Sequence, residues 1–231
     1  DNQIEGWRQR EIPVMRVANR KELDNAVRVA KPGTTILLAP GNYQGGLTAQ
    51  NLHGTKTRPI TIAGADHNNP PVFEGGRSGL HFIAPRYLTL RNFIVSNIET
   101  NGINIDDGGE VNSPTHHITL SDLTVRDISG RGNCDGIKIS GLQNFRIESC
   151  RLKRWGSGGS GIDMVGCHDG LIFRCSFEHD EDSKGANGVQ AKGGSRGVSI
   201  RRCRFKDAGG RAINLGGSTG ADYFRPNNAR A

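Results

Sequence analysis

The sequence predicts an all-β fold, a right-handed parallel β-helix with a capping α-helix at its N-terminal end. Three observations support this prediction: a six-residue phrase recurs along the chain, a second phrase with its own register lies between the copies, and apolar residues alternate within both. Copies of the first phrase begin at positions 102, 136, 161, 188 and 212, so their starts lie 34, 25, 27 and 24 residues apart. A variable period of this size is typical of a solenoid whose rungs carry loops of different length.

The first phrase has the form of a half-buried strand. Its clearest copy is Gly188-Val-Gln-Ala-Lys-Gly193, with apolar residues at the second and fourth places and mostly polar residues at the third and fifth. Alternation of period two predicts a strand that buries one face. The apolar pairs of the five copies are Ile103 and Ile105, Ile137 and Ile139, Ile162 and Met164, Val189 and Ala191, and Ile213 and Leu215.

The second phrase is apolar at places one, three, six and eight. It occupies residues 88–95, 118–125, 145–152 and 198–205, and more weakly 170–177. The gap between places three and six indicates a bend between two short strands. Each repeat therefore has three short strands, and successive repeats pair in parallel at a spacing of about 4.8 Å.

We expect residues 1–231 to form a single domain. Residues 1–33 provide an irregular lead-in, over residues 1–17, and a capping helix, because Asn19 and Glu22 resemble a capping box ahead of apolar residues at helical spacing. Residues 34–217 form the rungs, and residues 218–231 form a polar tail without a cap. An uncapped rung exposes unpaired backbone, so we expect residues beyond Ala231, or another chain, to cover the C-terminal end.

Composition narrows the range of partners. The net charge of +7 favours polyanions, while no apolar run approaches the roughly 18 residues of a membrane span. No RNA signature or zinc-finger spacing is present, so nucleic acid is not an expected partner. Acidic polysaccharides are among the polyanions that this charge favours, and for a protein that acts on them we expect a secreted or periplasmic location. The charge can also belong to a solvated outer strand.

Stacking of the rungs brings distant polar residues into two outward columns. The third places give Asn104, Lys138, Asp163, Gln190 and Asn214, and the fifth places give Asp106, Ser140, Val165, Lys192 and Gly216. Side chains one rung apart lie about 5 Å from each other. Lys192 is therefore expected diagonally from Asp163, with Arg211 at the mouth of the next strand.

These columns suggest β-elimination from a uronic acid. The reaction needs a base for the proton α to the carboxylate and positive charge to stabilise the developing enolate. Lys138, Lys192 and Arg211 are the catalytic candidates, since neighbouring cations lower the pKa of a lysine. The candidates for substrate binding are Asp135, Asp163, Asn187, Gln190 and Asn214.

Three other interpretations of these outward columns remain open. Lys138 and Lys192 can simply pair with Asp163 on a solvated sheet. Asp135 and Asp163 can also be the carboxylate pair of a glycoside hydrolase. A third alternative is a non-catalytic carbohydrate-binding or structural β-helix. Under any of the sugar-binding interpretations, Trp155 and Tyr223 are candidates for stacking on sugar rings.

The opening of the chain resembles that of pectate-lyase-like β-helix proteins. The residues that carry the resemblance are Glu22-Leu23, Lys31-Pro-Gly33, Pro40-Gly-Asn-Tyr43 and Pro59-Ile-Thr-Ile62. The most similar group is polysaccharide lyase family 6, which includes chondroitinase B and alginate lyases. As a pattern, the resemblance covers most of the chain, and its opening phrases are shared by many β-helix proteins.

The resemblance implies roles for particular residues. In that family a lysine at the end of the main strand is the base, an arginine one rung later assists, and calcium neutralises the sugar carboxylate. Lys192 matches the lysine, whereas the arginine aligns near Gly216 rather than at Arg211. The acidic calcium ligands align near Gly185 and Asn187, and neither residue is acidic. The resemblance thus supports Lys192 and argues against a family-type calcium site. The sequence requires no cofactor, and it leaves calcium binding open.

Overall fold

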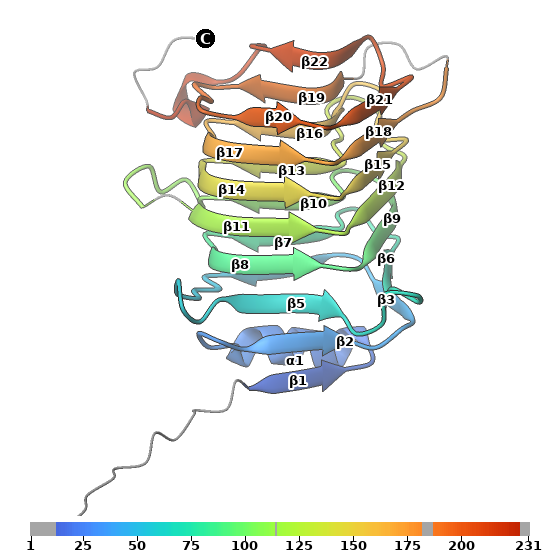
Figure 1. The fold of residues 1–231 in the computed structure, drawn as a ribbon, viewed down its shortest axis with the longest axis vertical. Helices are drawn as coiled ribbons and strands as arrows, with labels where there is room; N and C mark the ends of the chain where they lie inside the picture. Colours follow the sequence, from blue (N-terminus) through green and yellow to red (C-terminus); the bar gives the residue numbers. More distant parts are fainter. Residues whose placement is uncertain (1–12, 114, 182–186, 227–231) are drawn as a thin grey trace, which may run out of the picture.

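The computed structural model describes residues 13–113, 115–181 and 187–226. The chain forms an all-β, right-handed parallel β-helix, and successive turns stack along one axis (Figure 1). Each regular turn gives one strand to each of three parallel sheets, which we call sheets A, B and C. The predicted fold class is confirmed.

The strands of each sheet are neighbours in space although they are far apart in the chain. Sheet A contains β1 (Val14–Val17), β2 (Thr35–Leu38), β5 (Ile60–Gly64), β8 (Arg86–Arg91), β11 (Thr115–Ser121), β14 (Leu142–Glu148), β17 (His168–Phe173) and β20 (Ser199–Arg201). Sheet B contains β3 (Asn42–Gln44), β6 (Val72–Glu74), β9 (Ile94–Ile98), β12 (Thr124–Ile128), β15 (Arg151–Lys153), β18 (Ser176–Glu178) and β21 (Arg204–Lys206). Sheet C contains β4 (Leu47–Gln50), β7 (Leu80–Ile83), β10 (Ile103–Asp106), β13 (Ile137–Ser140), β16 (Ser160–Val165), β19 (Asn187–Lys192) and β22 (Arg211–Leu215).

The N-terminal end of the solenoid is closed by α1 (Arg20–Val29), as predicted (Figure 1). Asn19 caps the helix by accepting a hydrogen bond from the backbone N of Glu22, and Leu23, Ala26 and Val27 are buried beneath it. The prediction of an irregular lead-in up to residue 17 was wrong in part. Val14–Val17 forms β1 and pairs in parallel with β2, so the first rung begins before the helix. None of the helices in the described ranges is long and apolar enough to cross a membrane.

The interior is filled by the alternating apolar residues of the repeats. Ile103, Ile137 and Ile162 stack at the second place of consecutive sheet C strands, and all three are fully buried. Burial of a side chain of this size contributes about 1.5–3 kcal/mol. The polar residues between them consequently point outward on sheet C.

The C-terminal end has a different character. Leu215 on the edge strand β22 is 80% exposed, and the prediction that this end is covered by further residues or by another chain stays a prediction. Residues 220–226 do not lie over this edge, because they turn back along the side of the solenoid. There they include the short 3₁₀ helix η1 (Ala221–Tyr223) beside the ends of the sheet C strands (Figure 1).

Candidate functional site

The parallel register of sheet C confirms the two predicted columns. His81, Asn104, Lys138, Asp163, Gln190 and Asn214 are successive partners at the third place. At the fifth place the partners are Ile83, Asp106, Ser140, Val165 and Lys192. Both columns belong to the outward face of sheet C, because the intervening second and fourth places fill the core.

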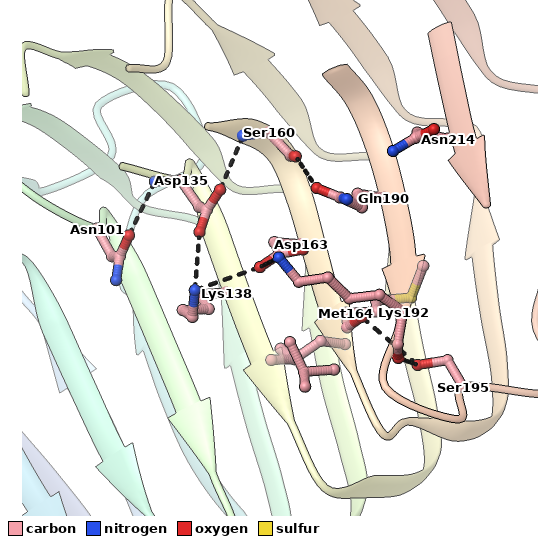
Figure 2. A network of polar contacts seen from close by, with 12 residues as sticks. Asn101, Asp135, Lys138, Ser160, Asp163, Met164, Gln190, Lys192, Ser195 and Asn214 are labelled. Atoms are coloured by element: carbon pink, nitrogen blue, oxygen red, sulfur yellow. Dashed lines mark hydrogen bonds and ion pairs between the residues drawn. The ribbon is translucent and has the colours of Figure 1, made fainter. Parts of the chain in front are cut away.

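Two lysines converge on one carboxylate in these columns. Lys138 Nζ and Lys192 Nζ each lie 3.2 Å from Asp163 Oδ2, and Lys138 Nζ also lies 3.2 Å from Asp135 Oδ2 (Figure 2). The side chains of both aspartates are fully buried, whereas those of Lys192 and Lys138 are 10% and 21% exposed. We call Asp135, Lys138, Asp163 and Lys192 the lysine–aspartate cluster. Only its two cations reach the solvent.

Asp135 is held from three sides. Its Oδ1 accepts a 2.8 Å hydrogen bond from the backbone N of Ser160, and its own backbone N donates to Asn101 Oδ1 at 2.8 Å (Figure 2). Burial, followed by the charge of Asp163, raises the pKa of Asp135 to about 6, although Lys138 acts in the opposite direction. Asp135 is therefore a fully buried partner of Lys138.

The two lysines differ in the number of carboxylates that they contact. Burial lowers the pKa of Lys138, but the charges of Asp135 and Asp163 outweigh it and leave the pKa raised. Lys192 has an ion pair with Asp163 alone among the described residues. Asp163 Oδ1 is buried and has no hydrogen-bond partner in the described part of the chain, so it is a free acceptor next to the pair.

Gln190 and Asn214 continue the third-place column beyond the cluster. Gln190 Oε1 accepts from Ser160 Oγ at 3.3 Å, and Gln190 Nε2 donates to the carbonyl oxygen of Gly216 at 3.1 Å. Asn214 Nδ2 donates to the same carbonyl at 3.4 Å. These amides extend the polar face of sheet C beside Lys192.

The structure separates Arg211 from the cluster. Arg211 pairs with Asn187 at the start of β22 and β19, whereas Lys192 is the last residue of β19 (Asn187–Lys192). A rise of ~3.3 Å per residue puts the two ends of that strand ~16 Å apart. Arg211 thus stands at the start of its strand, as expected, whereas Lys192 ends one, and a shared role for Arg211, Lys138 and Lys192 stays a prediction. Asn187 lies at the same distant end and is buried.

A groove of ≈ 540 Å³ adjoins the cluster on the side of β10. Its lining includes Asn104, Asp106, Lys138, Asp222 and Tyr223. A groove of this volume matches the size of pockets that hold small ligands.

The two aromatic candidates differ in exposure to solvent. The side chain of Tyr223 is 63% exposed and lies at the groove. Trp155 is buried and packs edge-on against Phe177 and His179, so it is not available to a sugar. Tyr223 is the last residue of η1, which brings its ring to the groove. No pattern in the sequence predicts this position.

The lysine–aspartate cluster does not fit a calcium ion. No group of three or more His, Cys, Asp or Glu side chains suited to a metal occurs within the described ranges. The two carboxylates of the cluster already face ammonium groups, which repel a cation. Of the two positions where the family's ligands align, Asn187 carries an amide, and Gly185 lies outside the described residues.

The fold family follows from a comparison with known families. The model of the right handed beta helix region matches residues 78–228, which is more than half of the chain. The chain belongs to the right-handed β-helix family. No sequence among curated proteins matches it. The predicted resemblance to pectate-lyase-like β-helix proteins is confirmed at the level of the fold, while the closer likeness to polysaccharide lyase family 6 stays a prediction.

Several solved structures share this β-helix. An alginate lyase from Paenibacillus sp. str. FPU-7 superposes with a TM-score of 0.73 at 21% identity, over 89% of this chain and 76% of that one. The pectate lyase Pel9A superposes with a TM-score of 0.60 at 15% identity, over 84% of this chain and 63% of that one. A tailspike protein of Acinetobacter baumannii bacteriophage Fri1, a capsular polysaccharide depolymerase, superposes with a TM-score of 0.51 at 11% identity. The superposition covers 89% of this chain and 48% of that one. At these identities the similarity establishes the fold, which these polysaccharide-cleaving proteins share.

Proposed function

We propose that this β-helix protein is a polysaccharide lyase, secreted or periplasmic, that cleaves a uronate-containing glycan by β-elimination. The observation that carries the proposal is the convergence of Lys138 and Lys192 on Asp163 Oδ2, beside a groove on the outward face of sheet C. β-Elimination needs a fixed positive charge and a base on the same side of one sugar. The two lysines can divide these tasks.

Lys138 is the fixed charge. Its ammonium group is held by two buried carboxylates and by a raised pKa, so it stays protonated when substrate binds. In this position it neutralises the uronate carboxylate and stabilises the negative charge that develops on the enolate. The acidity of the adjacent C5–H bond rises as a result.

Lys192 is the base, and Asp163 prepares it. When a bound glycan excludes water, the ammonium of Lys192 passes a proton to Asp163, since a neutral pair avoids the desolvation of two charges. The charge of Lys138 favours the neutral amine further. Asp163 Oδ1, buried without a partner in the described residues, gives the carboxyl group a second oxygen for the proton.

The elimination then balances around the same amine. The amine of Lys192 takes the C5 proton, the C5–H electrons form the C4=C5 double bond, and the C4–O4 bond breaks. The leaving O4 takes the proton that Lys192 has just gained, which returns the amine to its starting state. One residue serves as base and acid when the proton and the leaving oxygen lie on the same face of the sugar. This route needs no contribution from the distant Arg211.

A glycoside hydrolase fits the geometry less well. Asp135 Oδ2 and Asp163 Oδ2 are no more than 6.4 Å apart, because each lies 3.2 Å from Lys138 Nζ. That ammonium group occupies the space between the carboxylates, where a hydrolase holds the glycosidic bond or the attacking water. Both side chains are also fully buried, so neither carboxylate can contact a sugar directly.

Incubation with alginate, pectate and glycosaminoglycans tests the proposal. We expect ultraviolet absorbance from unsaturated uronate ends with at least one polymer, and a loss of at least about 10³-fold in kcat for Lys192→Ala. Lys153→Ala is the matched control, because Lys153 pairs with Glu178 at 3.2 Å on sheet B, away from the cluster. New reducing ends without the absorbance support a hydrolase instead. Binding without any cleavage supports the non-catalytic alternative.

A further inference from the structure

The groove beside the lysine–aspartate cluster has a charge opposite to that of the lysines. Five charged side chains of the described residues line it: Asp106, Asp107, Lys138, Asp222 and Arg225. Lys138 already pairs with two carboxylates, and Arg225 Nε pairs with Asp107 Oδ2 at 2.9 Å. Asp106 and Asp222 thus remain as the groove's own charges. A second uronate placed here would meet these two carboxylates without a free cation in the groove lining.

Asp106 is fixed in this position by its neighbours. Its Oδ1 accepts from the backbone N of Gly108 at 2.9 Å, and its Oδ2 accepts from Asn104 Nδ2 at 3.2 Å. His81 Nε2 lies 2.6 Å from the same Oδ2. The only basic group that contacts Asp106 in the described residues is therefore the imidazole of His81.

The other wall of the groove comes from the far end of the chain. Arg225 binds Asp107 across 118 residues of sequence, and its backbone N donates to Gly193 O at 3.1 Å. His168 Nε2 donates to Arg225 O at 2.9 Å. A Cβ at Gly166 would lie 2.7 Å from Arg225 Cγ, so the glycine leaves room for this contact. We call residues 220–226 the C-terminal strap.

The strap gives the groove an exposed aromatic ring. Tyr223 is 63% exposed, and the neutral groups Asn101, Asn104 and Ser140 also line the groove. An aromatic face together with amide and hydroxyl groups suits an uncharged sugar ring, which offers C–H faces and hydroxyls. Asn104 and Lys138 are register partners on adjacent strands, about 4.8 Å apart, so this sugar adjoins the uronate held at Lys138.

We infer that the groove is a subsite for an uncharged, unsulfated sugar, and that the substrate is a heteropolymer in which the reacting uronate adjoins such a sugar. The inference rests on the proposed function for the location of the uronate. It narrows the substrate class from acidic glycans in general to glycans that contain both uronates and uncharged sugars. Asp106 and Asp222 are the residues that exclude homopolyuronates.

Competing polymers at pH 8 test this specificity. Hyaluronan and gellan, which contain uncharged sugars beside their uronates, are compared with polygalacturonate and polymannuronate. We expect kcat/KM to favour a mixed polymer at least about tenfold, and the Asp106→Asn/Asp222→Asn double variant to reduce this ratio several-fold. Glu178→Gln, on sheet B, controls for the loss of a carboxylate elsewhere. An equal or higher kcat/KM on a homopolyuronate overturns the inference, as does an unchanged ratio in the double variant.

A binding assay separates failure of this inference from failure of the proposed function. If no polymer yields unsaturated ends, the lyase proposal fails, and affinity electrophoresis of wild type and the double variant then decides the specificity of the groove. Stronger retardation by the mixed polymers, lost in the double variant, supports the subsite. Equal or stronger retardation by the homopolyuronates overturns it.

Discussion

Lys192 and Asp163 lie on neighbouring strands of sheet C, and their Nζ and Oδ2 atoms are 3.2 Å apart, with Lys138 at the same distance on the other side (Figure 2). One buried carboxylate thus holds two ammonium groups that come from rungs on either side of it. In the proposed mechanism, this arrangement places a base and a fixed charge within reach of one sugar. It also makes Asp163 the residue on which both lysines depend.

Substitution of Asp163 by Asn removes the acceptor that both lysines share. We expect kcat to fall at least about 10²-fold, because Lys192 loses the group that takes its proton. Breaking a buried ion pair also leaves uncompensated charge, so the free energy of unfolding should drop by about 3–5 kcal/mol. Steady-state kinetics and urea unfolding measure the two effects. Full activity in a folded Asp163→Asn variant contradicts the assigned role.

Asp135 makes stability depend on pH in an unusual direction. Its folded-state pKa of about 6 lies above the ordinary 3.8, so the folded state binds more protons than the unfolded state between these values. Stability from this group is therefore fully present below about pH 4 and is lost as pH rises toward 6, by an amount on the order of 3 kcal/mol. Asp135→Asn, which stays neutral, should gain stability relative to wild type between pH 4 and pH 7. Urea unfolding at both pH values measures the difference, and a relative loss for the variant contradicts the raised pKa.

The ion pair of Arg225 with Asp107 anchors the C-terminal strap. Asp107→Asn should speed amide hydrogen exchange in residues 220–226 while sheet C keeps its protection, because the strap opens locally. The loss of stability should be only about 1 kcal/mol, since the released Arg225 can reach water. Asp24→Asn, which removes the surface pair of Arg20 with Asp24, is the control and should leave exchange in the strap unchanged. Unaltered exchange in the strap of Asp107→Asn refutes the anchoring role.

Arg211 provides a test of the geometry along sheet C. Because it lies ~16 Å from Lys192 along the strand direction, Arg211→Ala should retain kcat within about threefold of wild type. Lys138→Ala should reduce kcat at least about 10²-fold by removing the fixed charge. The same absorbance assay measures both variants. A larger loss of kcat for Arg211→Ala than for Lys138→Ala would identify Arg211, rather than Lys138, as the fixed charge.

The interior of the solenoid and its open edge should respond differently to truncation. Ile162 is fully buried between neighbouring rungs, so Ile162→Ala should cost about 2–5 kcal/mol. Leu215 is 80% exposed on β22, and Leu215→Ala should change stability by less than about 0.5 kcal/mol in the isolated chain. Thermal or urea unfolding measures both. A large loss for Leu215→Ala indicates that something covers this edge in solution.

The sequence was most informative where residues repeat. Alternation within the six-residue phrase determined which side chains face outward, and stacking of the rungs then placed Lys138, Asp163 and Lys192 side by side. Neighbouring strands in parallel register leave little freedom once each phrase is recognised. The fold class and the core of the candidate site were therefore predictable.

Contacts outside the repeats were not predictable in this way. The pairing of Arg225 with Asp107 spans 118 residues and belongs to no period. Burial of Trp155 depends on how one loop packs over sheet B, and the role of Asp135 depends on the loop that precedes β13. The position of Arg211 at the start of its strand was predictable, but the pattern does not give the direction of its side chain. Such features follow from tertiary packing rather than from local pattern.

Mass spectrometry of the products from a uronate-containing polymer tests the central claim most directly. Wild type and Lys153→Ala should release oligosaccharides lighter by one water than the hydrolytic products, which marks the unsaturated end formed at each cleavage. Lys192→Ala should release none. Products with saturated ends, or unsaturated products in undiminished yield from Lys192→Ala, would contradict the assignment of the lysine–aspartate cluster as a β-elimination site.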